Sequence, residues 1–199
     1  MRTYVAFTDP SGGSSDSFTL AVAHLSLLKD AVLDTFIEKR PPFSPDGVVA
    51  EFAEILKSYR ITSVVGDRYA GEWPRERFRV HGIQYQPSER TKSEIYVAFL
   101  VLVNSKRCRI PCDKKLRAQL QALERRSSRT GRDVVDHAPG SHDDIANSVA
   151  GALVLAAADT ASRQPWAWVP TLDTAPRRSS LENLSPNHCG PERIWHKLN

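Results

Sequence analysis

Carboxylates stand at the ends of apolar segments of this chain, in places where they could hold a divalent metal ion. Asp9 closes the first apolar run, Asp67 closes a later one, and the pair Asp143 and Asp144 opens a third. An ionised carboxylate loses hydration beside buried apolar strands, so several in such places require a compensating partner. The usual partner is a divalent cation, which prefers oxygen ligands. The types and positions of these residues therefore predict a metal site.

The chemistry of such a site depends on whether the carboxylates meet at one edge of a sheet. If the strands that end at Asp9 and Asp67 are parallel neighbours, both side chains emerge beyond the carboxyl ends of the strands, where open α/β sheets bind ligands. A helix that enters this edge with Asp144 in its first turn would complete the cluster. Such a cluster can hold two metal ions about 3.5–4 Å apart, which generate a hydroxide and stabilise the leaving 3′-oxygen of a phosphodiester.

Each carboxylate also has a simpler interpretation, which the residues alone leave open. Asp9 precedes Pro-Ser-Gly-Gly and could be a turn residue, and Asp67 could be a loop residue. Ser141 and Asp144 fit a capping box at the start of a helix. The joint placement of the carboxylates at matching ends of elements, rather than any one of them, favours the metal site.

The net charge of +4 hides a strong asymmetry along the chain. Residues 104–132 contain ten basic and two acidic residues, whereas residues 133–159 contain five aspartates and no lysine or arginine. A basic stretch beside an acidic one suits a protein that binds the phosphate backbone next to a metal-binding cleft. A solvated helix face is the alternative. The residues that we expect to contact DNA are Arg68, Arg90, Lys92, Lys114 and Lys115.

An α/β domain must position these residues, and its pattern predicts a mixed sheet that begins as a β-meander. Strands are expected at 3–9, 17–23 and 31–39, then a helix from 44, and a buried parallel strand at 61–66. A short helix or loop at 72–79, a strand near 83–85, helices at 95–103 and 113–126, a last strand at 134–135 and a final helix capped by Ser141 complete the prediction. Helices flank the sheet. We expect one domain over 1–159 and an irregular tail, with prolines and tryptophans, over 160–199.

Bulk properties exclude some classes of protein. No apolar run approaches the length that spans a bilayer, and the N-terminus lacks a signal-peptide pattern. The cysteines, Cys108, Cys112 and Cys189, are odd in number and lack zinc-site spacing. This pattern favours a reducing compartment, with Cys108 and Cys112 as inert thiols.

The order of these pieces resembles the C-terminal nuclease domain of the large terminase subunit of tailed phages, over about residues 3–158. The first block is Asp9, a glycine-rich turn and then Asp16 before an apolar strand. The others are 66–73 around the second acidic residue, 82–85, 92–96 leading into the long helix, Ile110-Pro111 before the basic helix, and His142-Asp143-Asp144.

The resemblance implies an RNase H-like (RuvC-like) fold and an endonuclease that cleaves double-stranded DNA in viral genome packaging with two Mg²⁺ or Mn²⁺ ions. It implies Asp9, Asp67 and Asp144 as catalytic metal ligands, with Asp143 beside them in the metal site and Asp16 as nearby acidic support. We expect His142 to support the site rather than bind metal. The implied partners are DNA, a separate ATPase motor, a small terminase and a portal protein, in the cytoplasm of a bacterial host, without a membrane.

Two departures from the family bear on function. Many relatives place an acidic residue one turn after the aspartate pair, where this chain has Asn147. A neutral amide there predicts weak binding of one metal, better activity in Mn²⁺ than in Mg²⁺, and a gain from Asn147→Asp. None of the ten glycines precedes a lysine, so the chain lacks the phosphate loop of an ATPase motor. We therefore expect an excised domain or a standalone nuclease.

Two other functions remain open from the sequence. One is a junction-resolving nuclease of the same fold, which would prefer branched over linear DNA. The other is a DNA-binding or packaging module whose metal site has decayed, which would bind no metal.

Overall fold

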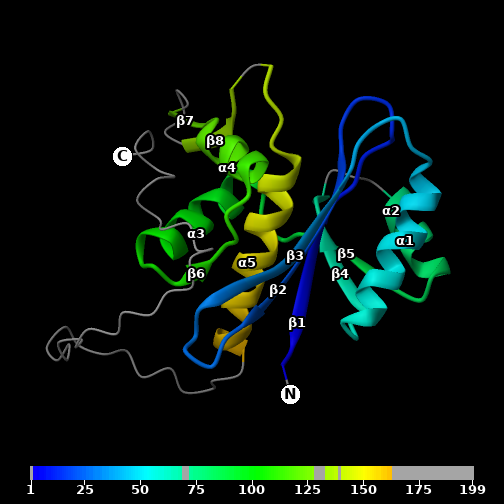
Figure 1. The fold of residues 1–199 in the computed structure, drawn as a ribbon, viewed down its shortest axis with the longest axis horizontal. Helices are drawn as coiled ribbons and strands as arrows, with labels where there is room; N and C mark the ends of the chain where they lie inside the picture. Colours follow the sequence, from blue (N-terminus) through cyan, green and yellow to red (C-terminus); the bar gives the residue numbers. More distant parts are fainter. Residues whose placement is uncertain (1, 69–71, 128–132, 139, 163–199) are drawn as a thin grey trace, which may run out of the picture.

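A central sheet with helices on both faces forms the body of the protein, seen in a computed structural model that describes residues 2–68, 72–127, 133–138 and 140–162 (Figure 1). Among the described residues the sheet has six strands in the order β5-β4-β1-β2-β3-β6. Their bounds are β1 Tyr4–Asp9, β2 Phe18–Leu25, β3 Ala31–Lys39, β4 Ser63–Gly66, β5 Gln84–Pro87 and β6 Cys108–Arg109.

The strand directions are those of the predicted mixed sheet. β1, β2 and β3 form an antiparallel meander, whereas β4 lies parallel to β1 and β5 lies parallel to β4. The short β6, which was not predicted, extends the other edge parallel to β3. The predicted fold class, an α/β domain with a meander followed by parallel strands, is confirmed.

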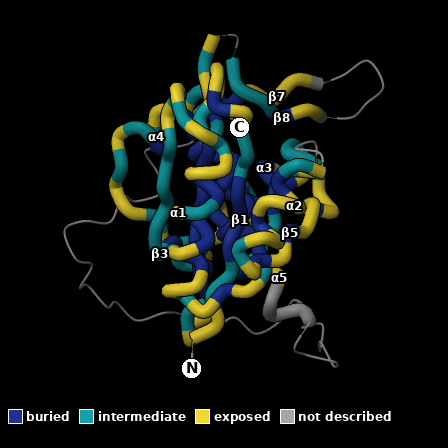
Figure 2. The backbone as a smooth tube through the Cα atoms, turned by 90° about the vertical axis from the view of Figure 1, so that its right-hand side faces the viewer, coloured by how far each residue is buried: buried dark blue, intermediate teal, exposed yellow. Residues whose placement is uncertain are grey.

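Helices cover the two faces unequally, and each face has its own apolar core. The helices α1 and α2 lie on one side of the sheet and α3, α4 and α5 on the other (Figure 1). Ala6 and Phe7, successive residues of β1, point into the two different cores. Buried residues gather along the central strands (Figure 2). The bounds are α1 Pro45–Ser58, α2 Trp73–Val80, α3 Lys92–Asn104, α4 Lys114–Gln121 and α5 Asp144–Ser162.

The helix α5 packs directly onto β1 and β2, and a glycine permits its close approach. A Cβ atom built on Gly151 would lie 2.4 Å from the ring of Phe7, which is 1% exposed. No side chain fits there without displacing the aromatic ring. This contact fixes the helix against the strand that ends at Asp9.

The helix predicted over 113–126 is wrong in its second half. The helix α4 ends at Gln121, and the chain continues as β7 Leu123–Ser127, which pairs with β8 Asp133–His137 in a separate two-stranded sheet. Leu116, Leu120 and Leu123 are all buried, as their helical spacing indicates. The pairing of Leu123 with His137 on β8 changes its backbone conformation, and a local pattern does not contain that contact.

The predicted capping of α5 by Ser141 is also wrong, because the hydroxyl of Ser141 donates to the carbonyl of Ala138. A residue distant in sequence takes the role: the side-chain oxygen of Gln119, on α4, accepts a hydrogen bond from the N–H of Ala146 at 3.0 Å. Gln119 is 6% exposed, so this bond lies inside the protein. A backbone N–H in the first turn of α5, which has no partner within the helix, is therefore hydrogen-bonded through a tertiary contact.

Cysteine chemistry differs from the prediction. Cys112 is disulfide-bonded, so its prediction as an inert thiol is wrong. Cys108 is a free thiol, and burial raises its pKa to about 12. Short sequence spacings do not reveal which thiols a fold brings together. The irregular tail was predicted over 160–199; residues 160–162 instead belong to the helix α5, and 163–199 lie outside the described residues. None of the described helices is long and apolar enough to cross a bilayer.

Candidate metal centre

Asp9 and Asp67 emerge side by side because their strands are parallel neighbours. Thr8 of β1 is in register with Gly66 of β4, and each aspartate is the next residue along its strand. The N–H of Asp67 donates to the carbonyl of Thr8 at 3.3 Å, which continues the pairing to the end of the sheet. The two carboxylates therefore leave the same edge, beyond the carboxyl ends of both strands.

A glycine and a tyrosine fix the backbone at Asp67. The hydroxyl of Tyr85, on β5, donates to the carbonyl of Asp67 at 2.8 Å. A Cβ atom on Gly66 would lie 2.4 Å from that same hydroxyl. Only glycine at position 66 lets Tyr85 cross β4 and reach Asp67, so the residue before the aspartate is part of how the site is built.

Asp144, the first residue of α5, is held at the same edge by the start of β2. The N–H of Ser17 donates to the carboxylate of Asp144 at 3.3 Å, and the hydroxyl of Thr19 donates to its backbone carbonyl at 2.8 Å. These bonds join residues more than 120 positions apart in the chain. They bring the start of the helix to the end of the sheet, where Asp9 and Asp67 lie.

The three carboxylates line one cavity of about 400 Å³. Its lining is mainly polar, and a glycine- and serine-rich loop between β1 and β2 forms one wall. The acidic residues that the sequence indicated as metal ligands or their support all line this cavity. Its lining residues are Asp9, Pro10, Ser11, Gly12, Ser14, Ser15, Asp16, Ser17, Asp67, Lys92, His137, His142, Asp143 and Asp144.

Burial and mutual repulsion disfavour the ionised carboxylates. Burial raises the pKa of Asp9 to about 7, and the charges of Asp67 and Asp144 add to this effect. A hydrogen bond from Asn147 and the charge of Lys92 act in the opposite direction. Burial likewise raises the pKa of Asp144. A cation bound among these carboxylates would offset their mutual repulsion and compensate for the hydration that burial removes. An all-oxygen donor set suits Mg²⁺ or Mn²⁺.

Asp143 already has internal partners. Its side chain is 4% exposed, and the ammonium of Lys92 lies 2.8 Å from one carboxylate oxygen and 2.7 Å from the other. The hydroxyl of Tyr96 donates to the second oxygen at 2.7 Å. Both partners belong to α3, so this cluster ties α3 to the start of α5. The role of Asp143 as a metal ligand stays a prediction.

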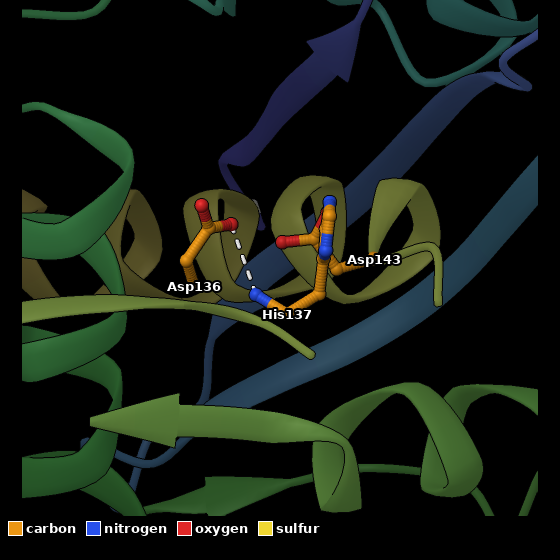
Figure 3. Close-up of side chains that lie close together, drawn as sticks. All are labelled: Asp136, His137 and Asp143. Carbon is orange, nitrogen blue, oxygen red and sulfur yellow. Dashed lines mark hydrogen bonds and ion pairs between the residues drawn. The ribbon is translucent and has the colours of Figure 1, made fainter. Parts of the chain in front are cut away.

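Asp136, His137 and Asp143 form a compact group (Figure 3), and His137 and Asp143 of this group line the cavity. One donor atom of each lies within 4.8 Å of the others, which is a spacing that could hold a metal ion. Lys92, however, also approaches Asp136 at 3.2 Å, so its ammonium lies between the two carboxylates. The lysine thus supplies positive charge to this group from within the chain.

Asn147 lies behind the cavity rather than in it. Its side chain is 1% exposed, and its Nδ2 donates to a carboxylate oxygen of Asp9 at 2.8 Å. Its Oδ1 is buried without a hydrogen-bond partner. The position one helical turn after Asp144 does face the carboxylates, as its spacing indicates.

The other predicted residues differ in exposure and in contacts. Asp16 and His142 line it, are both exposed, and approach each other to 3.7 Å. Arg68, Arg90 and Lys114 are exposed. Lys115 forms an ion pair with Glu38. The DNA contacts assigned to these basic residues stay predictions.

Sequence reasoning missed several residues that shape the site. Tyr96, Asp136, His137 and Glu38 were not singled out, although each contacts a residue that was. Glu38 accepts a hydrogen bond from the hydroxyl of Ser17 at 2.7 Å and also pairs with Lys115. The only local signal was the acidic character of residues 133–159. The partners of these residues come from distant segments, which no local pattern contains.

Several solved structures share this fold. The large terminase nuclease from thermophilic phage G20c with bound magnesium has a TM-score of 0.64 and 22% identity, over 76% of this chain and 80% of that one. The HK97 bacteriophage large terminase has a TM-score of 0.61 and 15% identity, over 78% of this chain and 40% of that one. A mutant nuclease domain of the large terminase subunit of bacterial virus Sf6, with manganese and beta-thujaplicinol, has a TM-score of 0.54 and 15% identity, over 77% and 87%.

No protein-family model matches the sequence, and no curated protein matches it either. The likeness in structure shows that the chain has the RNase H-like fold of large terminase nuclease domains, as predicted.

Proposed function

We propose that this chain is a divalent-metal-dependent endonuclease of the large terminase type, which cleaves double-stranded DNA during viral genome packaging. The observation that carries the proposal is the common cavity of Asp9, Asp67 and Asp144 at the end of the sheet. These carboxylates come from three separate segments of the chain, and burial and neighbouring carboxylates disfavour the ionised forms of Asp9 and Asp144. A bound divalent cation would stabilise the three carboxylates together in their ionised forms.

In this proposal Asp9, Asp67 and Asp144 hold Mg²⁺ or Mn²⁺. Two such ions supply an activated water and stabilise the leaving oxygen of a phosphodiester. The protein contributes the placement: paired strands set Asp9 beside Asp67, and Ser17 orients Asp144. The G20c and Sf6 nucleases with magnesium and manganese support the choice of metals.

Asp143 has a different task in this proposal. Its two oxygens are taken by Lys92 and Tyr96, so it anchors the first turn of α5 and thereby places Asp144. His142 and Asp16 stand at the exposed rim, where they can support incoming substrate or solvent around the metals.

DNA would approach over the basic residues around the cavity. Lys114 is exposed at the start of α4, and Arg68 and Arg90 are exposed near the ends of β4 and β5. Lys92 and Lys115 are held by carboxylates within the fold, so they contribute to the local field more than to direct contact.

The further partners follow from the same proposal. In this proposal an ATPase motor, a small terminase and a portal protein act together with the nuclease when DNA is packaged. The chain covers 40% of the HK97 large terminase, so that protein contains much that this chain does not match. The working compartment would be the cytoplasm of a bacterial host.

Cleavage of supercoiled plasmid tests the proposal. We expect nicked and linear products with Mn²⁺ or Mg²⁺, and none with EDTA. Asp67→Ala should lower the rate by at least about 100-fold, because even residues outside the first layer of a metal site cost 10–100-fold. Asp46→Ala, an exposed aspartate on α1, is the matched control and should cut normally. Wild-type protein that binds no metal in calorimetry would instead indicate a non-catalytic module.

The salt dependence of DNA binding tests the basic surface. Lys114→Glu should weaken binding to all sequences alike and make the log-log salt slope shallower by about one unit, because one phosphate contact is lost. Lys57→Glu on α1 makes the same change of charge on the other side of the sheet and should leave the slope unaltered. Equal slopes for Lys114→Glu and wild type would mean that DNA enters elsewhere.

A further inference from the structure

Asn147 is a buried polar residue of which one side-chain atom has a hydrogen-bond partner within the described part of the chain and the other has none. It lies on α5 at 1% exposure, and its Nδ2 donates to Oδ2 of Asp9 at 2.8 Å. Its Oδ1 is buried and has no hydrogen-bond partner among the described residues. A buried acceptor without a partner destabilises a folded protein. An apolar residue would avoid that cost but would remove the donor to Asp9, so the bond to Asp9 is the feature that explains an asparagine at this position.

Among the described residues, the side chain of Asn147 forms its hydrogen bond with Asp9, a carboxylate that lines the cavity. The bond occupies one oxygen of Asp9 from the core side, since Asn147 is absent from the cavity lining. The rotation of the Asp9 carboxylate is thereby restricted, and its other oxygen is left for a ligand. Residues that hold a metal ligand in this way are a regular part of metal sites.

We propose that Asn147 is a positioning residue, which orients the Asp9 carboxylate for metal binding through its Nδ2–H. This inference rests on the proposed metal site. It requires a donor at position 147, not an additional negative charge. The gain that the sequence predicts for Asn147→Asp is therefore reversed: an ionised aspartate of the same shape presents only acceptors to Asp9, and the hydrogen bond is lost.

Calorimetric titration with Mn²⁺ tests this inference on the whole chain without any cleavage assay. Asn147→Asp and Asn147→Ala should each weaken Mn²⁺ binding by about 10- to 100-fold, the range typical of residues that orient metal ligands. Ser148→Ala is the matched control, because Ser148 is the next residue of α5, is fully buried, and donates only to Ile145. Its Mn²⁺ affinity should equal that of wild type.

Two further measurements separate positioning from a merely structural role. Thermal unfolding in EDTA should show Asn147→Ala no less stable than Ser148→Ala, because the substitution also removes the unpaired acceptor. In plasmid cleavage, kcat should fall while KM for DNA stays constant, because Asn147 does not line the cavity.

The outcomes distinguish this inference from the proposed function. If Asn147→Asp binds Mn²⁺ as tightly as wild type or more tightly, while Asp67→Ala loses binding, the inference is overturned and the metal site stands. If the Asn147 variants lose thermal stability but keep their Mn²⁺ affinity, Asn147 is only structural and the inference is again overturned. If wild-type protein itself binds no Mn²⁺, the proposed function and the inference fall together.

Discussion

Asp9→Asn should abolish DNA cleavage and, at the same time, make the metal-free protein more stable at neutral pH. The loss of cleavage follows from removing a charged ligand from the proposed metal site. The gain in stability follows from burial, which raises the pKa of Asp9 from 3.8 to about 7 in the folded protein. Asparagine keeps an oxygen that can accept the hydrogen bond from Asn147, so the fold should be undisturbed.

The pH dependence of this gain has a definite sign. Below pH 3.8 the carboxyl is protonated in both the folded and unfolded states, so it favours neither. As the pH rises towards about 7, the unfolded chain ionises first, and the folded state loses stability relative to it. The full penalty, on the order of 4 kcal/mol as an upper bound, is present above neutral pH. Asp9→Asn removes this penalty, so its advantage should grow from pH 4 to pH 7.

Urea denaturation in EDTA over this pH range measures the effect. Asp16→Asn is the control, because Asp16 lines the same cavity but is exposed, and its substitution should give no pH-dependent gain. Added Mn²⁺ should stabilise wild type but not Asp9→Asn. A gain from Asp9→Asn that is the same at pH 4 and pH 7 would contradict the account of a buried carboxyl that resists ionisation.

The parts of the site that the sequence predicted are those set by local pattern and by the rules of parallel sheets. Asp9 and Asp67 end apolar runs, and two parallel strands in register must deliver such residues to one edge. The aspartate pair at 143–144 precedes an apolar helix, so its position at the start of a helix could also be predicted from the sequence. With β1 and β4 as parallel neighbours, the three segments were expected to meet at one edge of the sheet.

The remaining features depend on contacts between distant residues, which a single sequence does not contain. Asn147 and Asp9 are 138 positions apart, and Tyr96 and Asp143 are 47 apart. The spacing of Asn147 indicated that it faces the site, but not whether its amide would meet a metal or a carboxylate. The capping of α5 by Gln119 likewise needed α4 to be in place. In each case the hydrogen-bond partner is determined by tertiary packing rather than by local propensity.

Lys92→Met is expected to have the largest effect on stability, with a loss of at most about 3–5 kcal/mol, because it removes the charged partner of a buried carboxylate. The side chain of Asp143 is 4% exposed, and its ammonium partner lies 2.7 Å away. Methionine keeps most of the aliphatic length of lysine but has no ammonium group, so the hydroxyl of Tyr96 is left to donate to the Asp143 carboxylate. The packing of the start of α5 against α3 should weaken when this ion pair is lost.

A double substitution shows whether the loss comes from the stranded charge. Lys92→Met combined with Asp143→Leu replaces the pair by apolar side chains, which is often neutral or stabilising in buried sites. The double variant should therefore be more stable than Lys92→Met alone, although it should cut DNA poorly because Asp144 is no longer anchored. Lys115→Met is the surface control: its side chain is 40% exposed, and Glu38 keeps Ser17 and Arg40 as partners. If Lys92→Met unfolds at the same urea concentration as Lys115→Met, the Lys92–Asp143 pair does not hold the start of α5 in place.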